Sequence, residues 1–158
     1  MEHWELEARE CIRDLVARYT HLGDGGRVEE LAELFEPDGV LEPTGQPPMV
    51  GRPAIAGFLG GLAEGHVAVP GITYVRHHVA NLCIDVDPPD LVTGQACWAS
   101  GKAYWLVVNN AGLWRWGRYR DRYHRSADGR WRFAHRTVRR DPPVAEDGAG
   151  AGARAGAD

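Results

Sequence analysis

Asp121 and His135 are the residues in this sequence best placed by pattern for proton transfer, because they lie in two alternating runs joined by a turn. A period of two is typical of a β-strand with one solvated face and one covered face. The pattern predicts a hairpin that turns its arginines outward and buries both titratable groups among aromatic rings. The outward set is Arg118, Arg120, Arg122, Arg130, Arg132 and Arg136, and the covered set is Tyr119, Asp121, Tyr123, Trp131, Phe133, His135 and Thr137.

Two interpretations of Asp121 and His135 remain open at this point. Burial beside aromatic rings raises the pKa of a carboxyl group and lowers that of an imidazole, so either group can exchange protons near neutral pH. Alternatively, the two bond each other, or Tyr119 and Tyr123, inside the core. Without any such partner, burying them costs several kcal/mol.

A second set of candidates comprises Asp24, in a glycine-rich break, and the adjacent His77 and His78. An aspartate beside glycines is ordinary turn chemistry. Adjacent histidines project to opposite sides of a strand and cannot share a metal ion, and the chain has no HxH or HExxH spacing, so no metal is predicted. Phosphate-loop and Ser or Cys nucleophile motifs are also missing, so no cofactor is predicted. Apolar groups occupy both phases around the two histidines, so alternation does not decide which one faces the interior.

The elements that must position these residues come in the order helices, then strands. Apolar residues recur at helical spacing in the first third of the chain, near 4–22, 28–35 and 53–62. Four β-rich runs follow, at 72–86, 92–108, 113–125 and 130–139. This order predicts an α+β fold with a mainly antiparallel sheet. We expect one domain over residues 1–140 and a disordered Gly/Ala-rich tail over 141–158.

Composition narrows the classes of partner. The 158 residues carry a net charge of −4, which argues against nucleic-acid binding. No stretch approaches the ~20 apolar residues of a membrane span, and there is no leader pattern, so we expect a cytoplasmic protein without membrane contact. Cys11, Cys83 and Cys97 share no metal spacing and are expected to be buried free thiols.

A series of short motifs runs in order along the chain: Tyr19–Phe35, Asp38-Gly39-Val40, Gly51–Ile55, Arg76–Val79, Gly117-Arg118-Tyr119 and Asp128–Phe133. Taken together, these motifs resemble a SnoaL-like domain of the nuclear transport factor 2-like superfamily, whose members include scytalone dehydratase, ketosteroid isomerase and limonene epoxide hydrolase. The resemblance runs from about residue 8 to 140. It implies a conical barrel, in which a curved sheet and three helices from the N-terminal half enclose an apolar pocket, and a homodimer.

The resemblance also implies roles for single residues. Asp24 stands where the dehydratase has a pocket aspartate, and His78 stands where it has the histidine that this aspartate orients; His77 is the second choice. Gly23 replaces the aromatic residue that precedes the aspartate in the dehydratase, so the resemblance does not extend to that substrate. Asp121 is similar in position to the late-strand aspartate of the SnoaL cyclase.

The sequence thus predicts a cofactor-independent lyase, isomerase or cyclase that uses general acid–base catalysis on a hydrophobic, polyketide- or steroid-like molecule. The expected catalytic residues are Asp24, His78 and Asp121. The expected substrate contacts are Tyr19, His77, Trp98, Tyr104, Tyr119, Phe133 and His135. Two alternatives stay open: a non-catalytic small-molecule-binding or scaffold module, similar to the small subunit of aromatic-ring dioxygenases, and an epoxide hydrolase.

Overall fold

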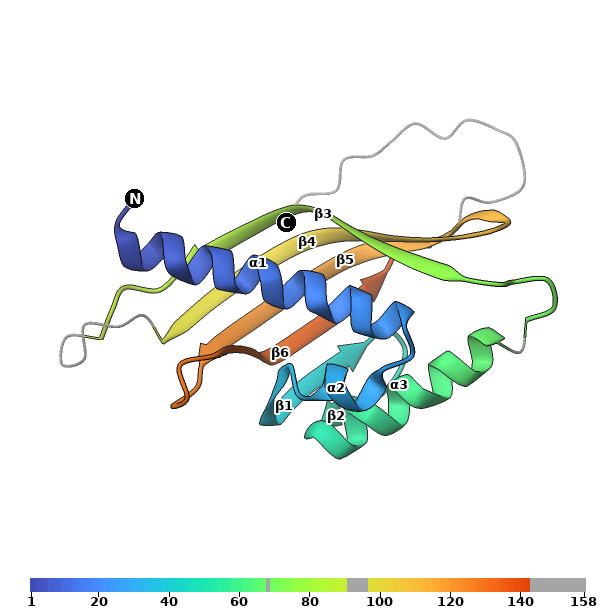
Figure 1. Ribbon diagram of the computed structural model, residues 1–158, viewed down its shortest axis with the longest axis horizontal. Helices are drawn as coiled ribbons and strands as arrows, with labels where there is room; N and C mark the ends of the chain where they lie inside the picture. Colours follow the sequence, from blue (N-terminus) through green and yellow to red (C-terminus); the bar gives the residue numbers. More distant parts are fainter. Residues whose placement is uncertain (68, 91–96, 143–158) are drawn as a thin grey trace.

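The computed structural model describes residues 1–67, 69–90 and 97–142, and Figure 1 shows how their helices and strands are arranged. Of the disordered tail predicted over 141–158, residues 143–158 therefore lie outside the described part of the chain. The three helices are α1 (His3–Asp24), α2 (Val28–Ala32) and α3 (Arg52–Val67). All three precede the long strands in the chain, as the sequence order predicts.

The first helix is long because its apolar residues keep helical spacing from Ala8 to Tyr19 and bury one continuous stripe. It ends where the glycines begin. Gly26 has a φ of +68°, a left-handed conformation that glycine adopts without steric cost, and it turns the chain into α2. This ending fixes the position of Asp24, the last residue of α1.

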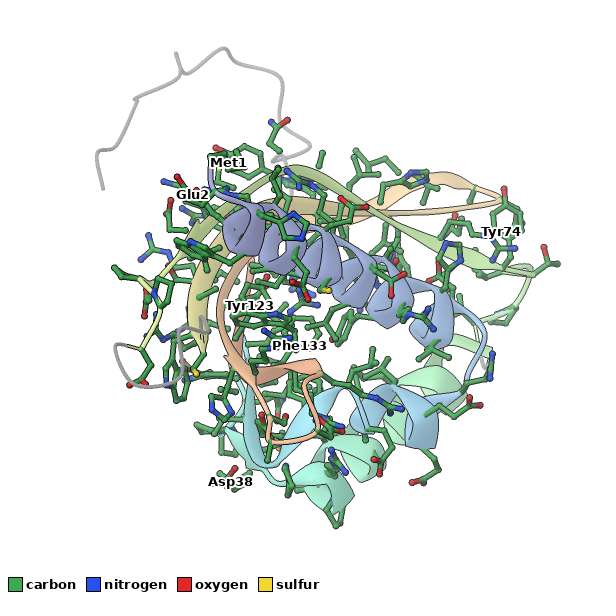
Figure 2. The ribbon with its side chains drawn as sticks, turned by 60° about the vertical axis from the view of Figure 1, so that its left-hand side comes forward. Met1, Glu2, Asp38, Tyr74, Tyr123 and Phe133 are labelled. Carbon is green, nitrogen blue, oxygen red and sulfur yellow. The ribbon has the colours of Figure 1, made fainter. Side chains whose placement is uncertain are left out.

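Six strands form one sheet in the order β2-β1-β6-β5-β4-β3. Every pairing is antiparallel except that of β1 with β6, which is parallel. The sheet is curved and open, because the edge strands β2 and β3 are not paired with each other (Figure 2). The α+β class with a curved, mainly antiparallel sheet is confirmed. The strands are β1 (Phe35–Pro43), β2 (Met49–Val50), β3 (Val75–Val86), β4 (Trp98–Asn109), β5 (Gly112–Arg125) and β6 (Trp131–Arg140).

The core lies between the helices and one face of the sheet, which we call the inner face. Tyr19 of α1 packs edge-on against Phe133 of β6 at a centroid distance of 5.6 Å, and Phe35 lies 5.1 Å from the same ring. Figure 2 shows Tyr123 and Phe133 inside the molecule, between α1 and the strands, and Tyr74 at its periphery. This aromatic cluster holds α1 in place over the sheet.

The predicted alternation fails in the second half of β6. Arg122 pairs with His135 and Tyr123 pairs with Phe133, so Ala134 is an extra residue, a β-bulge. The bulge reverses the phase of every residue after it. Arg136 is consequently fully buried, and His135 lies on the other face, where its Nε2 is 3.1 Å from Glu42 Oε2. The predictions of an outward Arg136 and a covered His135 are wrong.

Two aromatic residues predicted to line the pocket also lie on the outer face. Trp98 is 39% exposed and Tyr104 is 57% exposed. In β4 the inner positions hold Ala99, Gly101 and Ala103 instead. A Cβ on Gly101 would meet the ring of Tyr123 at 2.8 Å, so the space above this part of the strand is already filled and only small residues fit.

The cysteines differ from the prediction as well. Cys11 and Cys83 are exposed, and Cys97 is half-buried. Cys83 precedes the buried Ile84 in β3 and therefore points to the opposite face, whereas Cys11 in α1 lies beside the buried stripe that contains Ile12.

Candidate active site

A cavity of about 580 Å³ lies between α1, α3 and the inner face of the sheet. Its walls are mostly apolar and include Leu31, Phe58 and Val107. A concave apolar site with a few polar groups is the usual form of a small-molecule site. Among the residues predicted to contact a ligand, Tyr19, His77 and Tyr119 line this cavity, whereas Trp98, Tyr104, Phe133 and His135 do not.

Asp24 and His77 form the carboxylate–imidazole pair of this site. His77 Nδ1 lies 2.5 Å from Asp24 Oδ1, and the backbone N–H of His77 donates to Asp24 Oδ2 at 2.9 Å. Both oxygens of the carboxylate are therefore engaged by one residue. The side chains are 11% exposed for Asp24 and 26% for His77.

The partner of Asp24 is thus His77, and the expected pairing with His78 is wrong. In β3 the residues Val75, His77 and Val79 face inward, whereas Arg76 and His78 face outward and are exposed. His78 borders a second hollow of about 470 Å³, which Asp24, Arg76 and His77 also line. Apolar residues on both phases of this strand concealed its orientation from the sequence.

Electrostatics favours an ionised Asp24. Burial by itself raises the pKa of this carboxyl, but the hydrogen bonds from the ring and backbone of His77 outweigh burial, and the pKa lies below its ordinary value of 3.8. A carboxylate accepts, so Nδ1 carries the proton of the neutral imidazole. Nε2 is then the nitrogen with a free lone pair, and His77 also lines the cavity.

Three further polar groups border the cavity near this pair. Burial raises the pKa of both Tyr19 and Tyr119 above the ordinary value, so their hydroxyls stay protonated as hydrogen-bond donors. Beyond burial, the negative charge of Asp24 also raises the pKa of Tyr119. Trp105 Nε1 is buried and has no hydrogen-bond partner among the described residues. The hydroxyls of Tyr19 and Tyr119 are the groups of this set that can donate to a polar atom of a ligand.

Asp121 lies in a buried ion pair instead of the cavity wall. Arg136 donates to it from Nε at 2.9 Å and from Nη2 at 2.8 Å, and the Tyr123 hydroxyl donates at 2.8 Å. Burial lowers the pKa of Arg136, but the charge and hydrogen bonds of Asp121 outweigh burial and raise it. Of the two interpretations of Asp121, the structure supports the core-bonded one, with Arg136 in place of His135.

The guanidinium of Arg136 is also enclosed by rings. Its Cζ lies 4.2 Å from the ring centroid of Tyr19 and 4.1 Å from those of Tyr119 and Phe133. Cation–π contact in a desolvated site is worth about 2 kcal/mol. The guanidinium of Arg136 therefore packs against Tyr19 and Tyr119, the two tyrosines of the cavity wall.

Sequence reasoning missed Trp105, Val107 and Arg115, which all line the cavity. The covered phase of β5 that contains Tyr119 continues backward through Gly117 to Arg115, so alternation offered a signal for that residue. The alternation in β4 offered no such signal for Trp105 and Val107, because the first inward-facing residues of this strand are small.

No group of three His, Cys, Asp or Glu side chains suited to a metal ion occurs in residues 1–67, 69–90 and 97–142. Within the same ranges, no helix is both long and apolar enough to cross a membrane.

A family model of the SnoaL-like domain matches residues 4–137. The chain belongs to the SnoaL-like domain family. Its fold is also that of solved nuclear transport factor 2-like proteins, one of which, a protein with a cystatin-like fold from Novosphingobium aromaticivorans, is 28% identical with a TM-score of 0.70 and coverage of 84% of this chain and 81% of that chain.

Two other solved structures are similar to this SnoaL-like domain. One is a Catenulispora acidiphila protein in complex with S-DNPA, 31% identical, with a TM-score of 0.69 and coverage of 85% of this chain and 94% of that chain. The other is a variant of Rv3472, a protein of unknown function from Mycobacterium tuberculosis, 28% identical, with a TM-score of 0.72 and coverage of 89% and 75%.

Proposed function

We propose that this SnoaL-like domain is a cofactor-independent lyase, isomerase or cyclase that moves a proton on a hydrophobic ring molecule of polyketide or steroid type. The observation that carries the proposal is the Asp24–His77 pair, whose imidazole borders an apolar cavity. A histidine oriented by a carboxylate is the usual form of a general base near neutral pH.

In the proposed reaction, His77 Nε2 takes a proton from a carbon next to a carbonyl group. The imidazolium that forms is stabilised by Asp24, and the electron pair of the broken C–H bond moves to the carbonyl oxygen as an enolate. A hydroxyl of Tyr19 or Tyr119 donates a hydrogen bond to that oxygen. Such a positioned base contributes about a hundred- to ten-thousand-fold in rate.

The enolate has three outcomes, which correspond to the three reaction types. The imidazolium returns its proton to another carbon in an isomerisation, or to a leaving hydroxyl in an elimination, which releases water. In a cyclisation the enolate carbon attacks a second carbonyl of the same molecule, and the imidazolium protonates the resulting alkoxide. Each outcome restores neutral His77 and needs no external oxidant or reductant.

Epoxide opening is a weaker candidate. It requires a carboxylate that activates a water molecule. Asp24 bonds to His77 of the cavity wall, and both of its oxygens are engaged by that residue. The non-catalytic alternative, a binding or scaffold module, keeps the same cavity and is separated from the proposal by experiment.

The test measures hydrogen–deuterium exchange of the acidic carbon positions of β-tetralone, a two-ring ketone, by NMR in deuterated buffer. We expect the wild-type protein to accelerate exchange over buffer and His77→Gln to remove this acceleration. The matched control is His78→Gln, the neighbour on the outward phase, which should exchange like wild type. Binding of the ketone without acceleration would support the non-catalytic module, and loss in His78→Gln alone would overturn the assignment of the base.

A further inference from the structure

Two arginines, Arg115 of β5 and Arg140 at the end of β6, line the same apolar cavity as His77. The inward direction of Arg115 follows from its phase, since Gly117 and Tyr119 on the same strand are buried on the inner face. Arg140 pairs across the ladder with Gly117, and its backbone N–H donates to Thr44 Oγ1 at 2.8 Å. The backbones of both residues are therefore paired within the sheet, that of Arg115 next to the bulged Trp114.

Neither arginine forms an ion pair with a carboxylate of the described residues. Neighbouring arginines on the same two strands do, as in the pairs Arg118–Asp141, Arg136–Asp121 and Arg139–Glu42. The guanidinium of Arg115 instead lies 3.9 Å from the ring centroid of Trp114. Burial lowers its pKa, and the like charge of Arg140 lowers it further. Two cations that repel each other beside an apolar wall are a site that an anion would stabilise.

The rest of the wall is consistent with an anionic guest. No Asp or Glu side chain of the described residues lines the cavity. Its apolar walls favour ring systems, so the arginines are the groups that set the charge of the ligand.

Strand register gives the distance between this charge and the candidate base. His77 pairs with Val107, and Val107 pairs with Arg115, so the three residues form one row across β3, β4 and β5. Neighbouring strands are about 4.8 Å apart, which separates the backbones of His77 and Arg115 by about 10 Å. That length is about that of two fused six-membered rings.

We propose that the cavity binds an apolar ring molecule that carries a carboxylate, which Arg115 and Arg140 bind, with the backbones of Arg115 and His77 separated by about 10 Å. The position of the reacting carbon relative to the carboxylate rests on the proposed function. The binding of the acid does not, because it needs no turnover.

The test compares β-naphthoic acid with β-naphthamide, a neutral molecule of nearly the same shape. Each displaces the fluorescent apolar probe N-phenyl-1-naphthylamine from the protein, and the displacing concentrations are measured for wild type, Arg115→Gln/Arg140→Gln and Arg120→Gln. Arg120 is the matched control, since it is exposed on the outer face of β5. Val107→Phe, which fills the cavity between His77 and Arg115, reports whether the probe occupies the cavity.

We expect the acid to displace the probe from wild type at about one tenth of the amide concentration, because charge-assisted hydrogen bonds to a guanidinium are strong. The double variant should lose this preference for the acid, with the displacing concentration of the amide unchanged. The Arg120→Gln variant should keep the preference. High salt should weaken binding of the acid and leave binding of the amide unchanged. Equal displacement by acid and amide in wild type would overturn the proposal. A preference for the acid that survives in the double variant would also overturn it, as would probe binding that is unchanged by Val107→Phe. Failure of the ketone exchange assay with a retained acid preference would reject the catalytic function alone.

Discussion

Asp24, at the end of α1, binds both the ring and the backbone N–H of His77 in β3. The two bonds join the first helix to an edge strand of the sheet. They also fix which ring nitrogen of His77 is left to act on a ligand.

The Asp24→Asn variant should lower the rate of β-tetralone exchange by about a hundred- to ten-thousand-fold, the range of one positioned acid–base group. An amide cannot stabilise the imidazolium, and its NH₂ group can face Nδ1 and reverse the tautomer. Exchange is measured by NMR, with thermal unfolding as the control for folding. A variant that folds and exchanges at the wild-type rate would contradict the role of Asp24.

The same residue should link stability to acid pH. The pKa of Asp24 is lower in the folded protein than its ordinary value of 3.8, so its contribution is fully present above that value and is lost as pH falls through the folded pKa. Urea unfolding of wild type and Asp24→Asn at several pH values measures this. The difference in free energy of unfolding should shrink on acidification below 3.8, and a constant difference would count against the shift.

The Arg136→Met variant should be destabilised by about 3–5 kcal/mol, because it leaves Asp121 charged and buried without its partner. The double variant Asp121→Leu/Arg136→Met should recover part of that loss. Arg118→Met is the control, since its pair with Asp141 is more exposed, and should cost no more than about 1 kcal/mol. Urea unfolding measures all three, and equal losses for Arg136→Met and Arg118→Met would refute the account of the buried pair.

Two glycines should respond in opposite directions to alanine. At Gly117 an added Cβ would lie 2.0 Å from the carbonyl oxygen of Arg139 and 2.8 Å from Trp105 Cζ2, so Gly117→Ala should lose at least about 1–3 kcal/mol. At Gly57, in α3, the Cβ meets nothing within 4 Å, and Gly57→Ala should gain about 0.5–1 kcal/mol of helix stability. Thermal unfolding distinguishes the two, and a neutral Gly117→Ala would show that β5 and β6 approach less closely.

The sequence predicted the layers of this fold because helical and strand periodicities are properties of long segments. Alternation in β5 correctly placed Tyr119, Asp121 and Tyr123 on the covered side. The face on which a single residue lies was harder to predict. An inserted residue such as Ala134 leaves no mark in composition, yet it reverses the phase of all the residues that follow it in the strand.

The site was predicted in part for similar reasons. Asp24 was found through the family resemblance, but the choice between His77 and His78 depends on which face of an edge strand the helix covers. Trp98 and Tyr104 were misplaced because large aromatic residues usually mark an interior. Here the ring of Tyr123 occupies the space above Gly101, and the bulky Trp98 and Tyr104 lie on the outer face of β4.

The bulge at Ala134 decides which cation enters the core. The guanidinium of Arg136 keeps its proton, because the charge and hydrogen bonds of Asp121 raise its pKa above an already high ordinary value. If Ala134 took an ordinary place in the ladder instead of bulging, His135 would take the inner position and Arg136 the outer one. One bulged residue thus determines that the cation held inside the sheet is a guanidinium and not an imidazole.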